Sequence, residues 1–187
     1  MPLRERLLAS LFQAVTPRTA GFNTVDLTMI SEVGVMVMIL LMLIGGSPGS
    51  TAGGMKTTTV AVLFSTAISV FQKKESANLY GRRLPDGAVK NAVTVLMMYV
   101  VLFLGGGMII SYVEGIPLLT AIFETSSAIG TVGLTLGITT SLGTISRLIL
   151  IFLMFFGRVG GLTIIFAALA ERRAPVSKYP EGKITIG

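Results

Sequence analysis

Two matching stretches decide the fold of this chain: Thr19-Ala20-Gly21-Phe22-Asn23-Thr24, the first glycine loop, and Thr131-Val132-Gly133-Leu134-Thr135-Leu136, the second glycine loop. They lie 112 positions apart, and the match continues without a gap into the apolar residues that follow each of them. The same shift carries Gly45 onto Gly157. A repeat that spans a glycine turn and the apolar segment behind it indicates one structural unit used twice.

The composition excludes most classes of soluble protein. Hydrophobic residues make up 52% of the chain and charged residues 13%, against about 25% charged residues in globular proteins. Cys and His are both absent, which excludes disulfides, thiolate metal sites and imidazole bases, and no Ser/Lys or carboxylate cluster replaces them. The net charge of +6 comes from Lys and Arg grouped between apolar runs. This pattern is typical of an integral membrane protein and not of an enzyme or a nucleic-acid-binding surface.

The first half of the chain predicts a short helix, a loop and a broken helix. Residues 1–15 carry leucines at helical spacing but are shorter than the roughly 20 residues that cross a bilayer. We expect a re-entrant pore helix that points its C-terminal end at a cation, although an interfacial helix or an N-terminal arm stays open. Residues 31–71 would form a helix of roughly 60 Å, twice the hydrocarbon thickness. Pro48 and five glycines at 45–54 oppose helix there, so we expect two helices joined by irregular backbone.

The second half predicts a complete unit. A basic polar loop at 72–90 precedes an apolar span at 91–113, a second pore helix at 118–129 and a last span from about residue 146 to 169. The tail at 171–187 is basic again. With both basic segments in the cytoplasm, the glycine loops lie on the outer side and every crossing alternates. The predicted fold is therefore an all-α integral membrane protein of helix, pore-loop, helix repeats, partial at 1–71 and complete at 91–170, with one broken transmembrane helix.

The glycine loops are the candidate ion-selectivity filter. In such a filter the ligands are backbone carbonyls, so no charged side chain is needed, and Thr131-Val132-Gly133 is similar to the sequence of potassium-channel filters. The alternative is that both glycines serve only as turn residues. The predicted filter residues, with potassium bound by their carbonyls, are Thr19, Ala20, Gly21, Phe22, Thr131, Val132, Gly133 and Leu134.

Arg158 and the broken helix are the candidate gate. Gly45 follows Gly21 by 24 positions and Arg158 follows Gly133 by 25, so both are predicted at a similar depth beneath the filter. An Arg inside a span costs about 2.5–3.5 kcal/mol on insertion scales and therefore faces water or a partner. Glu124 or a backbone carbonyl are the structural alternatives. Lys56 either plays a similar role or extends to the cytoplasmic interface. Residues 157–161 also fit the small-residue motif of packed membrane helices.

These stretches resemble the Trk/Ktr potassium transporter superfamily, in particular its membrane subunit, which has four helix, pore-loop, helix repeats around one pore. The resemblance is carried by TPRTAGFNT at 16–24, GGSPGSTAGGMKTTT at 45–59, TSSAIGTVGLT at 125–135, GRVGGLT at 157–163 and EGKITIG at 181–187. It implies that the chain holds the end of repeat three and all of repeat four. Repeats one and two are missing, so we expect a piece of a longer polypeptide.

The resemblance also implies function and partners. Gly21 and Gly133 become filter glycines, and Arg158 the positive residue that faces the permeation path. The implied activity is potassium uptake across the plasma membrane with the C-terminus in the cytoplasm, no covalent cofactor, and sodium as an optional activator; a membrane scaffold without its own pore is the alternative. The implied partners are a second copy of the full subunit, a nucleotide-binding cytoplasmic ring and membrane lipids. The implied gating loop consists of Gly45, Gly46, Ser47, Pro48, Gly49, Ser50, Thr51, Ala52, Gly53 and Gly54.

Overall fold

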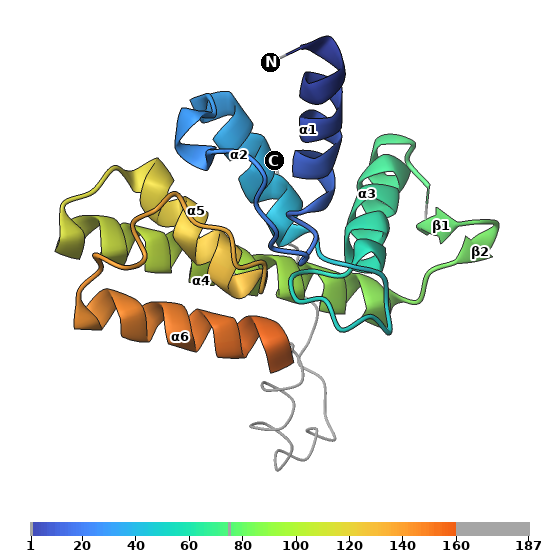
Figure 1. Cartoon of the computed structure of the whole chain (residues 1–187). Helices are drawn as coiled ribbons and strands as arrows, with labels where there is room; N and C mark the ends of the chain where they lie inside the picture. The colour runs from blue at the N-terminus through green and yellow to red at the C-terminus, as the bar shows by residue number, and fades with distance from the viewer. Residues whose placement is uncertain (1, 75, 160–187) are drawn as a thin grey trace.

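The chain folds into helices joined by structured loops (Figure 1). This computed structural model describes residues 2–74 and 76–159. The elements are α1 (Leu3–Val15), the short 3-10 helix η1 (Leu27–Met29), α2 (Glu32–Leu43), α3 (Thr57–Phe71), β1 (Asn78–Leu79), β2 (Arg82–Arg83), α4 (Asp86–Glu114), α5 (Leu118–Ile129) and α6 (Thr144–Val159).

The repeat seen in the sequence is present in the backbone. α2 begins at Glu32 and α6 at Thr144, 112 positions apart. Each is preceded by a short helix, α1 or α5, and by a glycine loop. The two copies differ at the C-terminal ends of these helices. α2 has 12 residues and ends at Leu43, whereas α6 has 16 residues up to Val159. The remainder of the predicted last span, Gly161 and the basic tail lie outside the described residues.

α5 lies at the centre of the packing, in contact with α2, α4 and α6. Figure 1 shows α5 and α6 alongside the long helix α4. Gly107 of α4 allows part of this close approach, because a Cβ there would lie 2.9 Å from the side chain of Ile122. Small residues let membrane helices pack in this way. Ala121 and all seven residues from Phe123 to Ile129 are buried, so a buried stretch of α5 leads up to the second glycine loop.

α4 is the element that matches a bilayer in length. It has 29 residues, and within the described part of the chain it alone is long and apolar enough to cross a membrane. The residue that caps its C-terminal end is Gly115, whose φ of 67° is the left-handed conformation that glycine adopts most easily at a helix end. The Ser111 hydroxyl donates a 2.7 Å hydrogen bond to the carbonyl of Ile116 in the same turn. This turn sends α5 back along α4.

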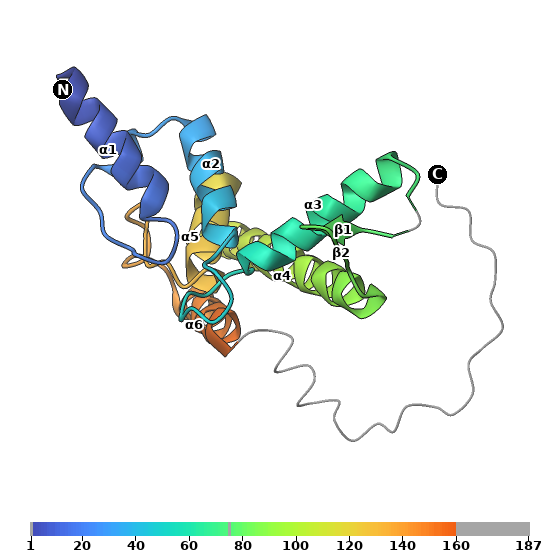
Figure 2. The same cartoon turned by 90° about the vertical axis from the view of Figure 1, so that its right-hand side faces the viewer.

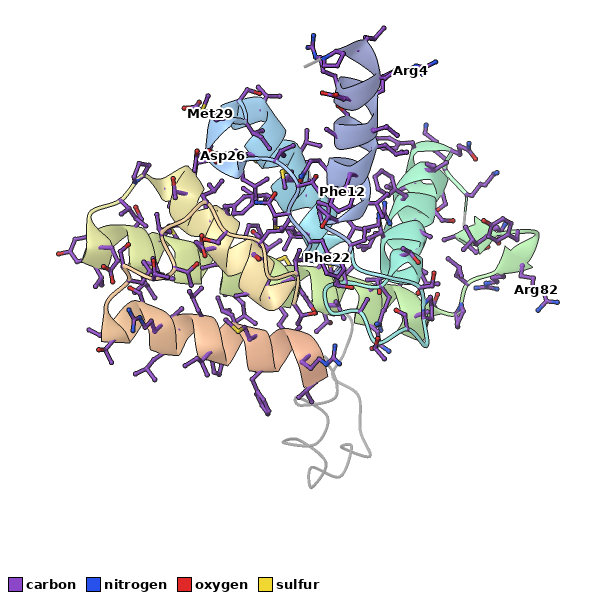
Figure 3. The ribbon with its side chains drawn as sticks, viewed as in Figure 1. Arg4, Phe12, Phe22, Asp26, Met29 and Arg82 are labelled. Carbon is purple, nitrogen blue, oxygen red and sulfur yellow. The ribbon has the colours of Figure 1, made fainter. Side chains whose placement is uncertain are left out.

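Two local features differ from the sequence-based prediction. α4 begins at Asp86, so it takes up the last residues of the range 72–90 that the sequence predicts as a loop. β1 and β2 form a small antiparallel hairpin within the same range, so the all-helical prediction omits one short sheet. Figure 3 shows Arg82 at the outer end of this hairpin. The hairpin needs only four paired residues, too few to leave an alternating pattern in the sequence.

α1 stands apart from the other helices. No residue of Leu3–Val15 is buried, and Figure 2 shows α1 projecting beyond the packed region on the side of α2. Its leucines, among them Leu7 and Leu11, are more than 60% exposed. A helix with an uncovered apolar face is placed by the membrane or by a neighbour and not by the described part of the fold.

Candidate functional site

The two glycine loops share an unusual backbone. Thr19 and Thr131 have φ values of 65° and 53°, and Gly21 and Gly133 have values of 71° and 89°. Positive φ is rare for a β-branched residue, and its recurrence at equivalent positions points to a functional conformation. Ala20 and Val132, the residues between Thr and Gly in the two loops, do not have a positive φ. The same order of a positive-φ Thr, a residue without positive φ and a positive-φ Gly therefore occurs in both loops.

The first glycine loop is held by Thr16, which follows the last residue of α1. The Thr16 side chain is 2% exposed, and its hydroxyl donates a hydrogen bond to the carbonyl of Phe22. Its own carbonyl accepts hydrogen bonds from the amides of Ala20 (3.1 Å) and Gly21 (3.2 Å). The Phe22 side chain is 70% exposed (Figure 3). One buried hydroxyl therefore ties the end of α1 to the loop.

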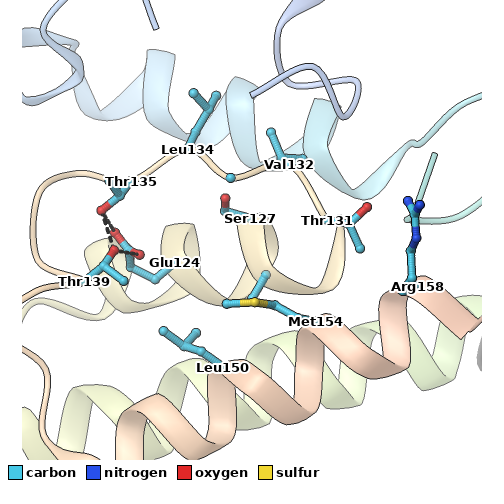
Figure 4. A pocket seen from close by; sticks show the side chains of 12 residues that line it. Glu124, Ser127, Thr131, Val132, Leu134, Thr135, Thr139, Leu150, Met154 and Arg158 are labelled. Carbon is cyan, nitrogen blue, oxygen red and sulfur yellow. Dashed lines mark hydrogen bonds between the residues drawn. The ribbon is translucent and has the colours of Figure 1, made fainter. Parts of the chain in front are cut away.

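The second glycine loop is held by Glu124. This carboxylate on α5 is 4% exposed. Figure 4 shows it between Thr135 and Thr139, which both donate hydrogen bonds to it from their hydroxyls. The amide of Leu136 donates a third, at 3.1 Å. A buried carboxylate is stable only when hydrogen bonds replace its water, and these three donors supply them.

The loops also contact each other. A Cβ on Gly21 would overlap the carbonyl oxygen of Val132, so the two loops meet backbone to backbone. Gly133 differs, because none of the described residues lies within 4 Å of its Cβ position. A side chain at position 21 is therefore opposed both by the contact with Val132 and by the positive φ. At position 133 it is opposed by the positive φ alone. The two predicted filter segments come together in the structure.

Residues 45–54 form a closed loop, here called the break loop, between α2 and α3. Its neck is a short parallel bridge between Ile44 and Met55. The Gly45 amide donates a 2.8 Å hydrogen bond to the Met55 carbonyl, and the Met55 amide donates one of 2.9 Å to Leu43. The middle of the loop, residues 47–51, is exposed. The break predicted from Pro48 and the glycines is present, with its ends joined by backbone hydrogen bonds and its tip exposed.

The break loop lies against the second glycine loop and α6. The Gly53 amide donates a 3.1 Å hydrogen bond to the hydroxyl of Thr131. Arg158 donates a 2.7 Å hydrogen bond from Nη1 to the carbonyl of Thr51. Of the two structural partners considered for Arg158, the structure selects the backbone carbonyl and not Glu124. Thr131, the break loop and Arg158 therefore form one connected group.

Lys56 is joined to the break loop in the same way. Its ammonium donates hydrogen bonds to the carbonyls of Ala52 (2.7 Å) and Ser50 (3.1 Å). The Lys56 ammonium is thus held at the break loop. Lys56 and Arg158 therefore bind three successive carbonyls, those of residues 50–52, and hydrogen bonds from charged donors are stronger than neutral ones.

α6 approaches the end of α5 because Gly157 has no side chain. A Cβ on Gly157 would overlap the carbonyl oxygen of Ile129. This contact supports the small-residue packing considered for residues 157–161, as far as the described residues extend. It also places Arg158, the next residue, beside the second glycine loop.

A cavity of about 410 Å³ lies between the second glycine loop, α5 and α6 (Figure 4). Glu124 lies toward one end of it and Arg158 toward the other. Thr131 and Gly133 of the loop and Met154 of α6 also line it. Sequence reasoning singled out the loop and Arg158 but considered Glu124 only as a partner for Arg158. A carboxylate in a short apolar helix followed by a threonine-rich loop was the available signal.

Comparison with known proteins agrees with this architecture. Residues 1–177 match the family model described as TrkH, cation transport protein. The chain is 42% identical to the potassium/sodium uptake protein NtpJ of Enterococcus hirae, over 98% of this chain and 42% of that protein. It is 37% identical to the Ktr system potassium uptake protein B of Bacillus subtilis, over 98% of this chain and 41% of that protein.

A solved structure gives the same fold. The crystal structure of the potassium transporter TrkH from Vibrio parahaemolyticus matches with a TM-score of 0.73 and 23% identity, over 90% of this chain and 39% of that chain. Helices, fold and family together define a membrane transport protein and not an enzyme. The chain belongs to the TrkH family of cation transport proteins. It spans about 42% of the length of the first of these curated relatives.

Proposed function

We propose that this chain forms part of a potassium-uptake pore in which the backbone carbonyls of both glycine loops coordinate the ion. The observation that carries the proposal is the shared backbone of Thr19, Gly21, Thr131 and Gly133 in two loops that touch. Carbonyl oxygens gathered on one side of a loop can replace the hydration shell of a cation. The names of the relatives support potassium as the ion, and one of them adds sodium.

Growth of a potassium-uptake-deficient bacterial strain tests the proposal. The full-length protein should restore growth on limiting potassium, and vesicles that contain it should take up potassium faster than empty ones. Surface labelling or membrane fractionation establishes that the protein is inserted. If the inserted protein rescues neither growth nor uptake, the pore is the wrong function and a scaffold role takes its place.

The break loop is the proposed gate, with Arg158 as its electrostatic partner. In the described arrangement the loop touches Thr131 of the second glycine loop through Gly53 and is bound by Arg158 through Thr51. A loop with pinned ends and an exposed tip can move without unfolding the helices on either side. We assign this arrangement to the closed state, in which the loop lies beneath the filter and the guanidinium opposes cation passage.

The proposed setting is the plasma membrane, with the hairpin and the C-terminus in the cytoplasm. Lys73, Lys74, Arg82 and Arg83 make the segment between α3 and α4 basic, which favours the cytoplasmic side. This face is the proposed contact for a nucleotide-binding regulatory ring, with a second copy of the full subunit as the other partner. Anionic lipids attract the same charges by about 1 kcal/mol per residue.

Reconstitution separates these partners. The full-length protein is placed in vesicles of neutral or anionic lipid, each with and without a purified regulatory ring, and the effect of nucleotide on potassium flux is measured. The ring model expects nucleotide control only when the ring is present, in either lipid. Control by nucleotide without the ring would contradict it.

A further inference from the structure

Glu124 is a buried side chain that the proposed pore does not otherwise use. Among the described residues, all its hydrogen-bond donors belong to the second glycine loop and its continuation: the Thr135 hydroxyl and the Leu136 amide to Oε1, and the Thr139 hydroxyl to Oε2 at 2.7 Å. Both carboxylate oxygens are therefore occupied by groups that lie two to six positions after Gly133. The donors come from the loop and the acceptor from the helix, so the carboxylate joins two elements.

The loop is folded around this carboxylate. The Gly137 amide donates a 2.9 Å hydrogen bond to the Thr135 hydroxyl oxygen, and the Thr139 hydroxyl lies 2.8 Å from the same atom. Thr135 is thus a donor to Glu124 and an acceptor from its own loop. Hydrogen-bond networks around a buried charge are cooperative, and removal of one member loosens the others.

Hydrogen bonds are needed here because packing behind the loop is incomplete. The cavity of about 410 Å³ reaches from Glu124 along Thr131 and Gly133 to α6. Side chains from α6 therefore do not fill the space on this side of the loop. Val132 and Leu134 pack into the core, but the part of the loop that faces the cavity depends on polar contacts for a fixed position.

The first glycine loop lacks an equivalent arrangement. Glu124, Thr135 and Thr139 correspond by the 112-residue shift to Phe12, Asn23 and Leu27. The first loop is instead held by the Thr16 hydroxyl on the Phe22 carbonyl. The carboxylate is thus a property of the second loop and not a general feature of the repeat.

We infer that Glu124 is a positioning residue that sets ion selectivity at the second glycine loop. It anchors the loop immediately after Gly133 and so determines where the carbonyls of residues 131–134 lie. This inference rests on the proposed function, because it takes these carbonyls as the ion ligands. Selectivity depends on the spacing of such ligands, and coordinating groups must be held to within about 0.5 Å.

Three variants of the full-length protein separate positioning from charge. Glu124→Gln removes the charge and replaces one acceptor by a donor. Glu124→Asp keeps the charge but shortens its reach, and Thr139→Val keeps the carboxylate and removes one donor. The matched control is Glu114→Gln, since Glu114 likewise accepts from a loop amide, that of Gly143 at 2.8 Å, and from a hydroxyl, but holds the start of α6.

The main readout is the initial rate of potassium and sodium uptake by reconstituted vesicles, over a range of ion concentrations. We expect Glu124→Gln to reduce the preference for potassium over sodium about tenfold, with a higher half-saturation concentration and a smaller change in maximal rate. Thr139→Val and Glu124→Asp should shift the preference in the same direction by less. Glu114→Gln should leave the preference unchanged.

A second readout does not depend on transport. The 187 residues contain no cysteine. In a full-length protein whose other cysteines have been replaced, a Leu136→Cys substitution therefore reports on the loop by its rate of reaction with a membrane-impermeant thiol reagent. Glu124→Gln should increase this rate several-fold, and Glu114→Gln should not. If the unmodified protein takes up no potassium but the labelling rate rises, the proposed pore fails while the anchor is real.

Two results would overturn the inference. One is an inserted Glu124→Gln protein with unchanged ion preference, half-saturation concentration and labelling. The other is an altered preference in Glu124→Gln alone, with Glu124→Asp and Thr139→Val both like the unmodified protein, since this pattern assigns the effect to charge and not to position.

Discussion

Substitution of Gly53 by alanine is the sharpest test of the proposed gate. Gly53 does not have a positive φ, so alanine introduces no backbone strain there. Its Cβ would lie 2.7 Å from Cγ2 and 2.9 Å from Cβ of Thr131 and would overlap Oγ1. Either the break loop or the second glycine loop must therefore move. The loop tip is exposed, whereas the amide of Thr131 is bonded to Ala128 at 3.0 Å, so we expect the break loop to yield.

The expected destabilisation of the closed arrangement by Gly53→Ala has two parts, a steric overlap and a lost hydrogen bond. Overpacking of this kind costs about 1–3 kcal/mol. Withdrawal of the loop also breaks the hydrogen bond from the Gly53 amide to Thr131, which contributes about 1 kcal/mol. Both changes act on the closed arrangement and not on one in which the loop has moved away. A destabilisation of about 2 kcal/mol or more lowers the ratio of closed to open protein roughly 30-fold.

The assay is potassium flux through vesicles that contain the full-length Gly53→Ala protein, with protein content measured in the same vesicles. The rate per protein should rise, and the preference for potassium over sodium should not change. The matched control is Gly105→Ala on α4, because the described residues leave open space within 4 Å of its Cβ position. An inserted Gly53→Ala protein with unaltered flux would refute the gate. An altered ion preference at unaltered rate would show that the filter, and not the break loop, had moved.

Three further predictions concern the same group of residues. Arg158→Gln removes the charged hydrogen bond to Thr51, so flux should rise several-fold, and Arg158→Lys should restore part of the control in the same flux assay. Gly133→Ser meets open space but forces a side chain into a φ of 89°, so it should weaken potassium affinity or admit sodium in competition uptake, and unchanged kinetics would reduce the loop to a turn. Gly157→Ala places a methyl group on the Ile129 carbonyl, so it should cost about 1–3 kcal/mol of stability, seen as a lower midpoint in a thermal aggregation assay of the detergent-solubilised protein.

The sequence predicts the helical elements well where the physical signal is local. The short helix at 118–129 has its bounds at Leu118 and Ile129, because Pro117 and Gly130 interrupt the apolar pattern on both sides. The start of α4 at Asp86 is missed, since the polar first turn of a helix resembles a loop in composition. The hairpin β1–β2 is missed because two-residue strands leave no periodicity.

The candidate site is predicted less completely. Both glycine loops, the break loop and Arg158 are found from glycine spacing, proline and an isolated charge within an apolar segment. Their roles as filter and gate remain proposals. The hydrogen bond between Gly53 and Thr131 joins residues 78 positions apart, and that between Arg158 and Thr51 joins residues 107 apart. No local pattern encodes which of several carbonyls or hydroxyls a distant donor will reach.

By itself, the sequence determined that the chain is a membrane protein of two related units and that residues 45–54 interrupt a helix. Both conclusions follow from short-range physics: the transfer of apolar side chains, the missing amide of Pro48 and the helix cost of glycine. Only the tertiary structure decided that the two glycine loops touch at Gly21, that Glu124 anchors the second of them and that Arg158 binds the break loop. These contacts join segments that are distant in the sequence. The position of Arg158 in particular depends on how closely α5 and α6 approach, which Gly157 permits but no single segment specifies.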